Sequence, residues 1–198
     1  MIDLEERIEM VTRNVIMAAI HHDLWSLHIH KNAWDTTEIY RETMMDLWAA
    51  NSLAHRYSFY VRTAAAYAQG PKVNGIPRLM RECSEKLTQE GAARLTSLFT
   101  EAKPLADKIE RLRNTVYAHQ SARMRVEHAY AEAKINLDMA QRLMVISIDI
   151  INELRTAVGL GATEISRSHI DQFERTMRAI GQSREDSLHP FGGVILGV

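Results

Sequence analysis

The residues best suited to chemistry stand together between Arg111 and His128. Four arginines and one acid, Glu127, give this stretch a local formal charge of +3 in a chain whose net charge is −1. The arginines are Arg111, Arg113, Arg123 and Arg125. Local positive charge of this size is where a phosphate backbone can bind, although a solvated helix face has a similar composition. The stretch is therefore a candidate nucleic-acid site in a chain that is too neutral to bind polyanions generally.

Arg113, Asn114 and His119 are the polar residues of this stretch whose order stands out. Five residues separate Arg113 from His119. On an unbroken α-helix a step of six residues turns through about 240°, so the two side chains would not share a face. A working pair therefore needs a helix end or distortion near His119, or a second subunit. The alternative is structural: an ion-paired arginine and a histidine that caps a helix end.

The elements that must position these residues are predicted to be helices. Gly and Pro are scarce, at 9 and 4 of 198 residues, which leaves long segments without helix breakers. Apolar residues recur every three or four positions, and alternating strand patterns are missing. Helices are expected over residues 4–31, 36–69, 76–88, 92–100, 123–158 and 163–180, with a further one that begins near Pro104. We predict an all-α fold, a helical bundle with long antiparallel helices.

The chain length and composition predict a single domain over residues 1–180, followed by an irregular tail over residues 181–198. One cysteine, Cys83, permits no intrachain disulfide. The acidic N-terminus lacks a secretory pattern, and no apolar stretch is long enough to span a bilayer. A cytoplasmic protein that does not contact a membrane is the expectation.

Histidines gather near the N-terminus at His21, His22, His28 and His30. His21 and His28 share a helical face, but the three- or four-residue spacing of helical metal ligands is absent. We expect solvated or core histidines there, and neither a metal site nor a cofactor. No dinucleotide or P-loop motif is present. Cys83 is expected to be a small buried hydrophobe.

The stretch Arg113-Asn114-Thr115-Val116-Tyr117-Ala118-His119 resembles the motif of the HEPN superfamily. The order of helices around it, over roughly residues 1–160, is similar to the branch of that superfamily found in abortive-infection and toxin–antitoxin systems. A long first helix and a second helix that includes the Tyr60–Tyr67 region come first, and the motif and a long helix follow. Some toxin members carry a tyrosine two residues after the histidine, where this chain has Ser121.

The resemblance implies an all-α homodimer in which two motifs face each other. It implies a metal-independent endoribonuclease that leaves 2′,3′-cyclic phosphate ends. His119 would act as general acid or base, Arg113 would stabilise the phosphate charge, and Asn114 would orient a group of the site. Arg111, Arg123 and Arg125 would contact RNA, and an antitoxin protein is a possible partner. Other HEPN proteins are not nucleases, so a non-catalytic RNA-binding or protein-interaction module is the alternative.

Overall fold

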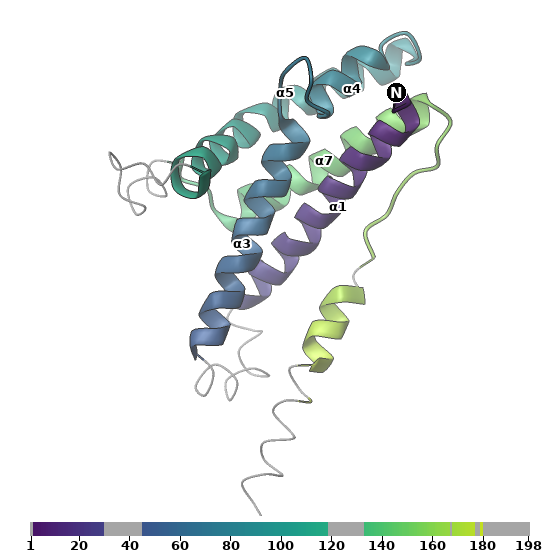
Figure 1. The fold of residues 1–198 in the computed structure, drawn as a ribbon. Coiled ribbons are helices and arrows are strands. Elements are labelled where there is room, and N and C mark those ends of the chain that lie inside the picture. Colours follow the sequence, from purple (N-terminus) through teal and green to yellow (C-terminus); the bar gives the residue numbers. More distant parts are fainter. Residues whose placement is uncertain (1, 30–44, 119–132, 167, 177–178, 180–198) are drawn as a thin grey trace, which may run out of the picture. The chain divides into compact units, whose positions relative to one another are not determined.

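The computed structural model describes residues 2–29, 45–118, 133–166, 168–176 and 179. Its elements are α1 (Leu4–Ile29), α3 (Met45–Tyr67), α4 (Ile76–Glu82), α5 (Gln89–Leu112), the π-helical η2 (Arg113–Ala118) and α7 (Leu137–Ala157) (Figure 1). Residues 168–176 form a further helix. The described ranges contain helices and no strand, so the predicted all-α bundle is confirmed.

The chain forms two compact units. The first comprises Met1–His22 and Arg56–Ile165, and the second comprises Asp23–His55 and Ser166–Val198. The predicted single domain over residues 1–180 stays a prediction. The tail predicted over residues 181–198 lies outside the described residues.

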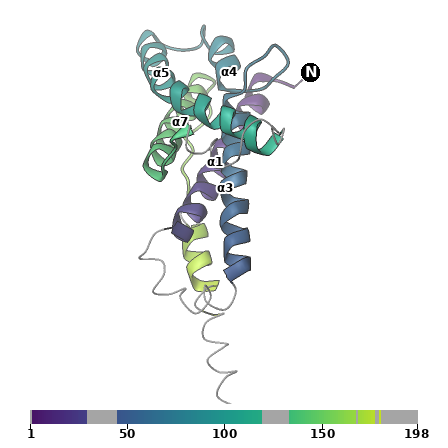
Figure 2. The same ribbon diagram turned by 90° about the vertical axis from the view of Figure 1, so that its left-hand side faces the viewer.

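The core of the first unit is built from the apolar faces of its α-helices. In this unit α1 and α3 run alongside each other in opposite directions (Figures 1 and 2), since Arg62 donates to Asn14 at 3.0 Å and the His22 ring lies against Phe59. Fully buried side chains come from α1, α3, α4, α5 and α7: Ile8, Val11, Phe59, Tyr60, Ile76, Leu79, Leu95, Ile109, Leu112, Leu143, Ile150 and Leu154. The three-to-four-residue spacing within each helix is what places these residues on one buried face.

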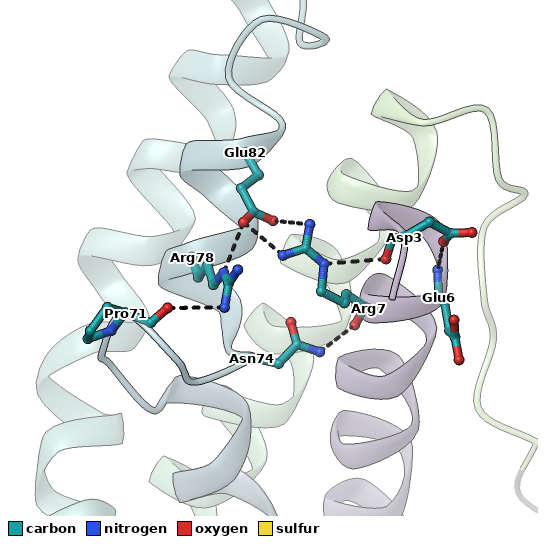
Figure 3. Close-up of polar contacts among 7 residues, drawn as sticks. All are labelled: Asp3, Glu6, Arg7, Pro71, Asn74, Arg78 and Glu82. Carbon is teal, nitrogen blue, oxygen red and sulfur yellow. Dashed lines mark hydrogen bonds and ion pairs between the residues drawn. The ribbon is translucent and has the colours of Figure 1, made fainter. Parts of the chain in front are cut away.

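A cluster of charges ties the start of α1 to α4 (Figure 3). The Arg7 guanidinium contacts both oxygens of the Glu82 carboxylate at 2.8 Å, and Arg78 donates to the same carboxylate at 2.9 Å. The Asn74 amide donates to the Arg7 carbonyl at 3.0 Å, so the loop before α4 is attached to α1 as well. Both arginines are thus occupied by one carboxylate, and the cluster fixes the fold at this point.

The prediction of a new helix at Pro104 is wrong. Helix α5 continues through Pro104, with Thr88 as its N-cap, and packs along α7. A proline inside a helix lacks the N–H that would bond to the carbonyl of Thr100, at a cost of about 3 kcal/mol. Because Pro104 is on the exposed side of α5, water reaches the freed carbonyl. The buried opposite face outweighs the loss, since tertiary packing supplies most helical stability.

The prediction of one continuous helix over residues 123–158 is also wrong in the described part of this range. The backbone of Lys134 is left-handed, with φ of 47°, and α7 begins only at Leu137. Asn136 is the N-cap, because its side chain accepts from the backbone N–H of Met139 at 2.8 Å. At the other end of α7, Gly159 has φ of 79° and ends the helix as predicted.

Two shorter expectations need correction. The helix predicted over residues 76–88 ends at Glu82, and turns follow it. The helix predicted from residue 163 does not start there, because residues 163–166 are not helical. Asn152 holds this segment in place: its amide donates to the Thr163 carbonyl at 3.2 Å, and its oxygen accepts from the Thr163 N–H at 2.8 Å.

The second unit is held by aromatic rings. His28 lies 4.3 Å from Trp48, 5.6 Å from His55 and 5.3 Å from Phe173, measured between ring centroids. The Asp23 carboxylate and the His169 ring, 3.2 Å apart, add a polar contact from α1 to the helix of residues 168–176. Residues far apart in sequence therefore share one small core.

Candidate functional site

Helix α5 carries the chain to the arginine of the motif. Its N-terminus is capped by Thr88, whose hydroxyl accepts from the Gly91 N–H at 3.1 Å. Its buried face is formed by residues at helical spacing: Leu95, Ala102, Ala106, Ile109 and Leu112. Leu112 is the last buried residue of this face, and Arg113 follows directly. The packing of α5 therefore fixes the position of the Arg113 backbone at the end of this helix.

The helix type changes at the first motif residue. α5 ends at Leu112, and Arg113–Ala118 are π-helical. The N–H of Arg113 is still bonded to the carbonyls of Ile109 and Glu110, which keeps it in line with α5. A π-helix has i→i+5 hydrogen bonds, so its turn is wider than an α-turn, and such segments are rare and frequent at functional sites. The helix is therefore distorted over Arg113–Ala118, and the position of His119 relative to Arg113 lies outside the described residues.

Arg113 and Asn114 are half-buried at this junction, and Arg111 is exposed one position before Leu112. Within the described ranges, neither Arg111 nor Arg113 has a carboxylate within ion-pair distance. The alternative of an ion-paired structural arginine therefore finds no partner for Arg113 in this part of the chain. Its guanidinium keeps donors that can bind an anion.

Three of the predicted site residues, His119, Arg123 and Arg125, lie outside the described residues. The described chain leaves this region at Ala118 and resumes at Ala133, shortly before α7. The structure thus describes Arg111, Arg113 and Asn114 where α5 meets η2 and does not test their relation to His119.

Two of the N-terminal histidines, His22 and His28, are core histidines, which is one of the two outcomes expected from the sequence. His22 and His28 are each 4% exposed. Burial lowers the pKa of His28 from its ordinary value, against a smaller opposite effect of its hydrogen bond to the Leu24 carbonyl. Burial also lowers the pKa of His21, with a contribution from the positive charge of Arg62. His30 lies outside the described residues.

The cluster of His28, His55, Trp48 and Phe173 was not foreseen from the sequence. No local pattern joins Phe173 to the other three, because it follows them by more than a hundred residues. Cys83 is fully buried, as predicted. Burial and the nearby charge of Glu82 raise the pKa of its thiol, which suits an inert packing role better than a nucleophile.

The described chain is all-α, with Arg113-Asn114 at the end of a packed helix and a long helix, α7, after it. Residues 1–176 match the AbiU2 family of HEPN domains. The chain belongs to this family, which is a HEPN-type abortive-infection family, and the predicted resemblance is confirmed. No curated protein and no solved structure matches the chain. In the described ranges, no helix combines the length and the hydropathy needed to cross a bilayer.

Proposed function

We propose that this protein is a metal-independent endoribonuclease of the HEPN toxin or phage-defence type, with a composite site at a homodimer interface. The observation that carries the proposal is the position of the motif. Residues 1–176 match an abortive-infection HEPN family, and within them Arg113 and Asn114 stand where α5 ends and the π-helix starts. At this junction the Arg113 guanidinium has no carboxylate partner among the described residues.

The proposed reaction transfers a phosphoryl group within the RNA strand. His119 of one subunit takes the proton of a ribose 2′-OH, and the 2′-oxygen forms a bond to the adjacent phosphorus. The bond from phosphorus to the 5′-oxygen breaks, and the second His119 donates a proton to that oxygen. The products are a 2′,3′-cyclic phosphate and a 5′-hydroxyl, with no net redox change. Histidine suits both steps because its reference pKa is about 6.5.

The arginines of the segment have separate proposed roles. Arg113 binds the reacting phosphate and stabilises the charge that develops on it, and Asn114 orients an oxygen of the site. Arg111, Arg123 and Arg125 bind neighbouring phosphates. In this proposal the protein acts in the cytoplasm, RNA and a second copy of the chain are its partners, and an antitoxin protein is a further possible partner.

The test is RNA cleavage in EDTA by the purified full-length chain. We expect products with cyclic phosphate ends, and a loss of rate of about 10²–10⁴-fold in His119→Ala. Arg113→Ala is expected to be similarly impaired. Arg94→Ala is the matched control, because Arg94 is an exposed arginine of α5 whose guanidinium pairs with Glu153 at 3.1 Å.

Size-exclusion chromatography with light scattering would test the dimer. Cleavage by wild type and by His119→Ala at equal rates would contradict the proposed mechanism. RNA binding that survives His119→Ala, with no cleavage by either protein, would identify the non-catalytic binding module instead.

A further inference from the structure

The cations along α5 and α7 differ in how they are paired. At the levels where the two helices pack, each described lysine or arginine has a carboxylate partner. These pairs are Arg94–Glu153, Lys103–Asp107, Arg142–Glu101 and Arg155–Glu9. The remaining cations of α5, η2 and the turn before α7 are Lys108, Arg111, Arg113 and Lys134. None of these four has a carboxylate partner among the described residues.

The four cations without a carboxylate partner among the described residues lie on one side of the contact between α5 and α7. The pairs Arg94–Glu153 and Glu101–Arg142 show that α5 and α7 run in opposite directions. The end of α5 and the start of α7 therefore lie on one side of this contact, and both are at the left of Figure 1. Lys108 is seven residues beyond Glu101, about 10 Å along the axis of α5. Lys134 stands three residues before the first residue of α7.

Few carboxylates are found on this side in the part of the chain that the structure describes. Asp107 lies one helical turn before Arg111, but its carboxylate is bonded to Lys103. Glu110 and Asp138 are the other acids of these segments, and neither forms an ion pair with a described residue. Among the described residues of these segments, four cations stand against these two acids, so the described charge beside the motif is net positive. An RNA backbone is attracted to such a surface.

The conformation of Lys134 adds an independent observation. Its φ of 47° lies in the left-handed region, which is disfavoured for a residue with a Cβ relative to the right-handed helix. Glycine would avoid this cost at the turn. Strained backbone positions of this kind cluster at functional sites. Lys134 is exposed, so this turn carries a positive charge that a glycine would not supply.

We infer that Lys108 and Lys134 bind RNA phosphates outside the reaction centre, so that the RNA strand extends from the motif over the end of α5 and the start of α7. This inference rests on the proposed function. Both lysines are binding residues only: their ammonium groups hold the strand and take no part in proton transfer. They lie outside the segment from Arg111 to His128 that the sequence singled out.

The experiment compares the full-length variants Lys108→Gln, Lys134→Gln and Lys103→Gln in RNA binding across a range of salt concentrations. All three remove one positive charge. Lys103 is the matched control, because it is a lysine of α5 whose ammonium is already bonded to Asp107. For a single-stranded RNA, a plot of the logarithm of the binding constant against the logarithm of the salt concentration has a negative slope. Each lost phosphate contact makes this slope less steep by about 0.7. We expect this change in Lys108→Gln and in Lys134→Gln, and a wild-type slope in Lys103→Gln.

Kinetics provide a second measurement in the cleavage assay. Loss of a contact made equally in the ground state and the transition state raises KM and leaves kcat unchanged, and this is the expected pattern for both lysines. Equal slopes in wild type and in both variants, or the same slope change in all three variants, would overturn the inference while the proposed function stands. A wild-type protein that does not bind RNA at all would overturn both.

Discussion

Tyr67 and Ser147 form a buried polar link between α3 and α7 whose two partners should differ in importance. The hydroxyls are 2.7 Å apart, and the Ser147 hydroxyl donates its only proton to the Leu143 carbonyl at 2.6 Å. Tyr67 must therefore be the donor to Ser147. Burial raises the pKa of Tyr67, against a smaller opposite effect of Ser147, so the phenol keeps the proton that it donates.

The two single substitutions leave different groups behind. Ser147→Ala leaves the Tyr67 hydroxyl buried without an acceptor, and we expect it to lower the free energy of unfolding by about 1–3 kcal/mol. Tyr67→Phe removes the donor and leaves Ser147 bonded to Leu143, so we expect a smaller loss of about 1 kcal/mol. In the double variant no buried hydroxyl is left unpaired, so its loss should be smaller than the sum of the two single losses.

Urea unfolding followed by circular dichroism measures all four free energies of the cycle. In a chain of this size, 1 kcal/mol corresponds to about 2–4 °C in Tm, which gives a second readout. The reasoning about donor direction would be refuted if Ser147→Ala cost no more than Tyr67→Phe. Additive losses in the double variant would show that the hydroxyls do not interact.

Three further predictions concern pH and the ends of α7. The pKa of His28 is lowered in the folded state, so the unfolded chain binds protons more readily than the folded chain. The free energy of unfolding should therefore fall as the pH drops below about 6.5. In urea titrations, His28→Phe should reduce that fall. Gly159→Ala should cost about 1 kcal/mol, because φ is 79° while no neighbour would meet the added Cβ. Gly161→Ala, which also meets open space, is the control and should leave Tm unchanged. Asn136→Ala removes the N-cap bond to Met139 and should cost about 1 kcal/mol, whereas an unchanged Tm would show that the cap contributes nothing.

Several properties of this protein follow from its sequence alone. The spacing of apolar residues along α1 and α5 predicts helices and the buried faces that carry Ile8 and Ile109, because helical periodicity is a local property of the chain. The Arg113-Asn114…His119 motif, in its order of helices, leads to the HEPN family that residues 1–176 match. Gly159 marks the end of α7 because a left-handed residue there favours glycine.

Tertiary structure decided where the helices continue and where they break. Pro104 reads as a helix start, but the packed face of α5 keeps the helix intact through it. Lys134 reads as a helical residue, yet the chain turns there, and only Asn136 beside it signals a cap. The sequence likewise does not show that Lys103 has a carboxylate partner while Lys108 has none among the described residues. Whether a charge has a partner depends on which side chains the fold brings within ion-pair distance. For α5 these include Glu153 and Arg142 of α7, which is distant in sequence.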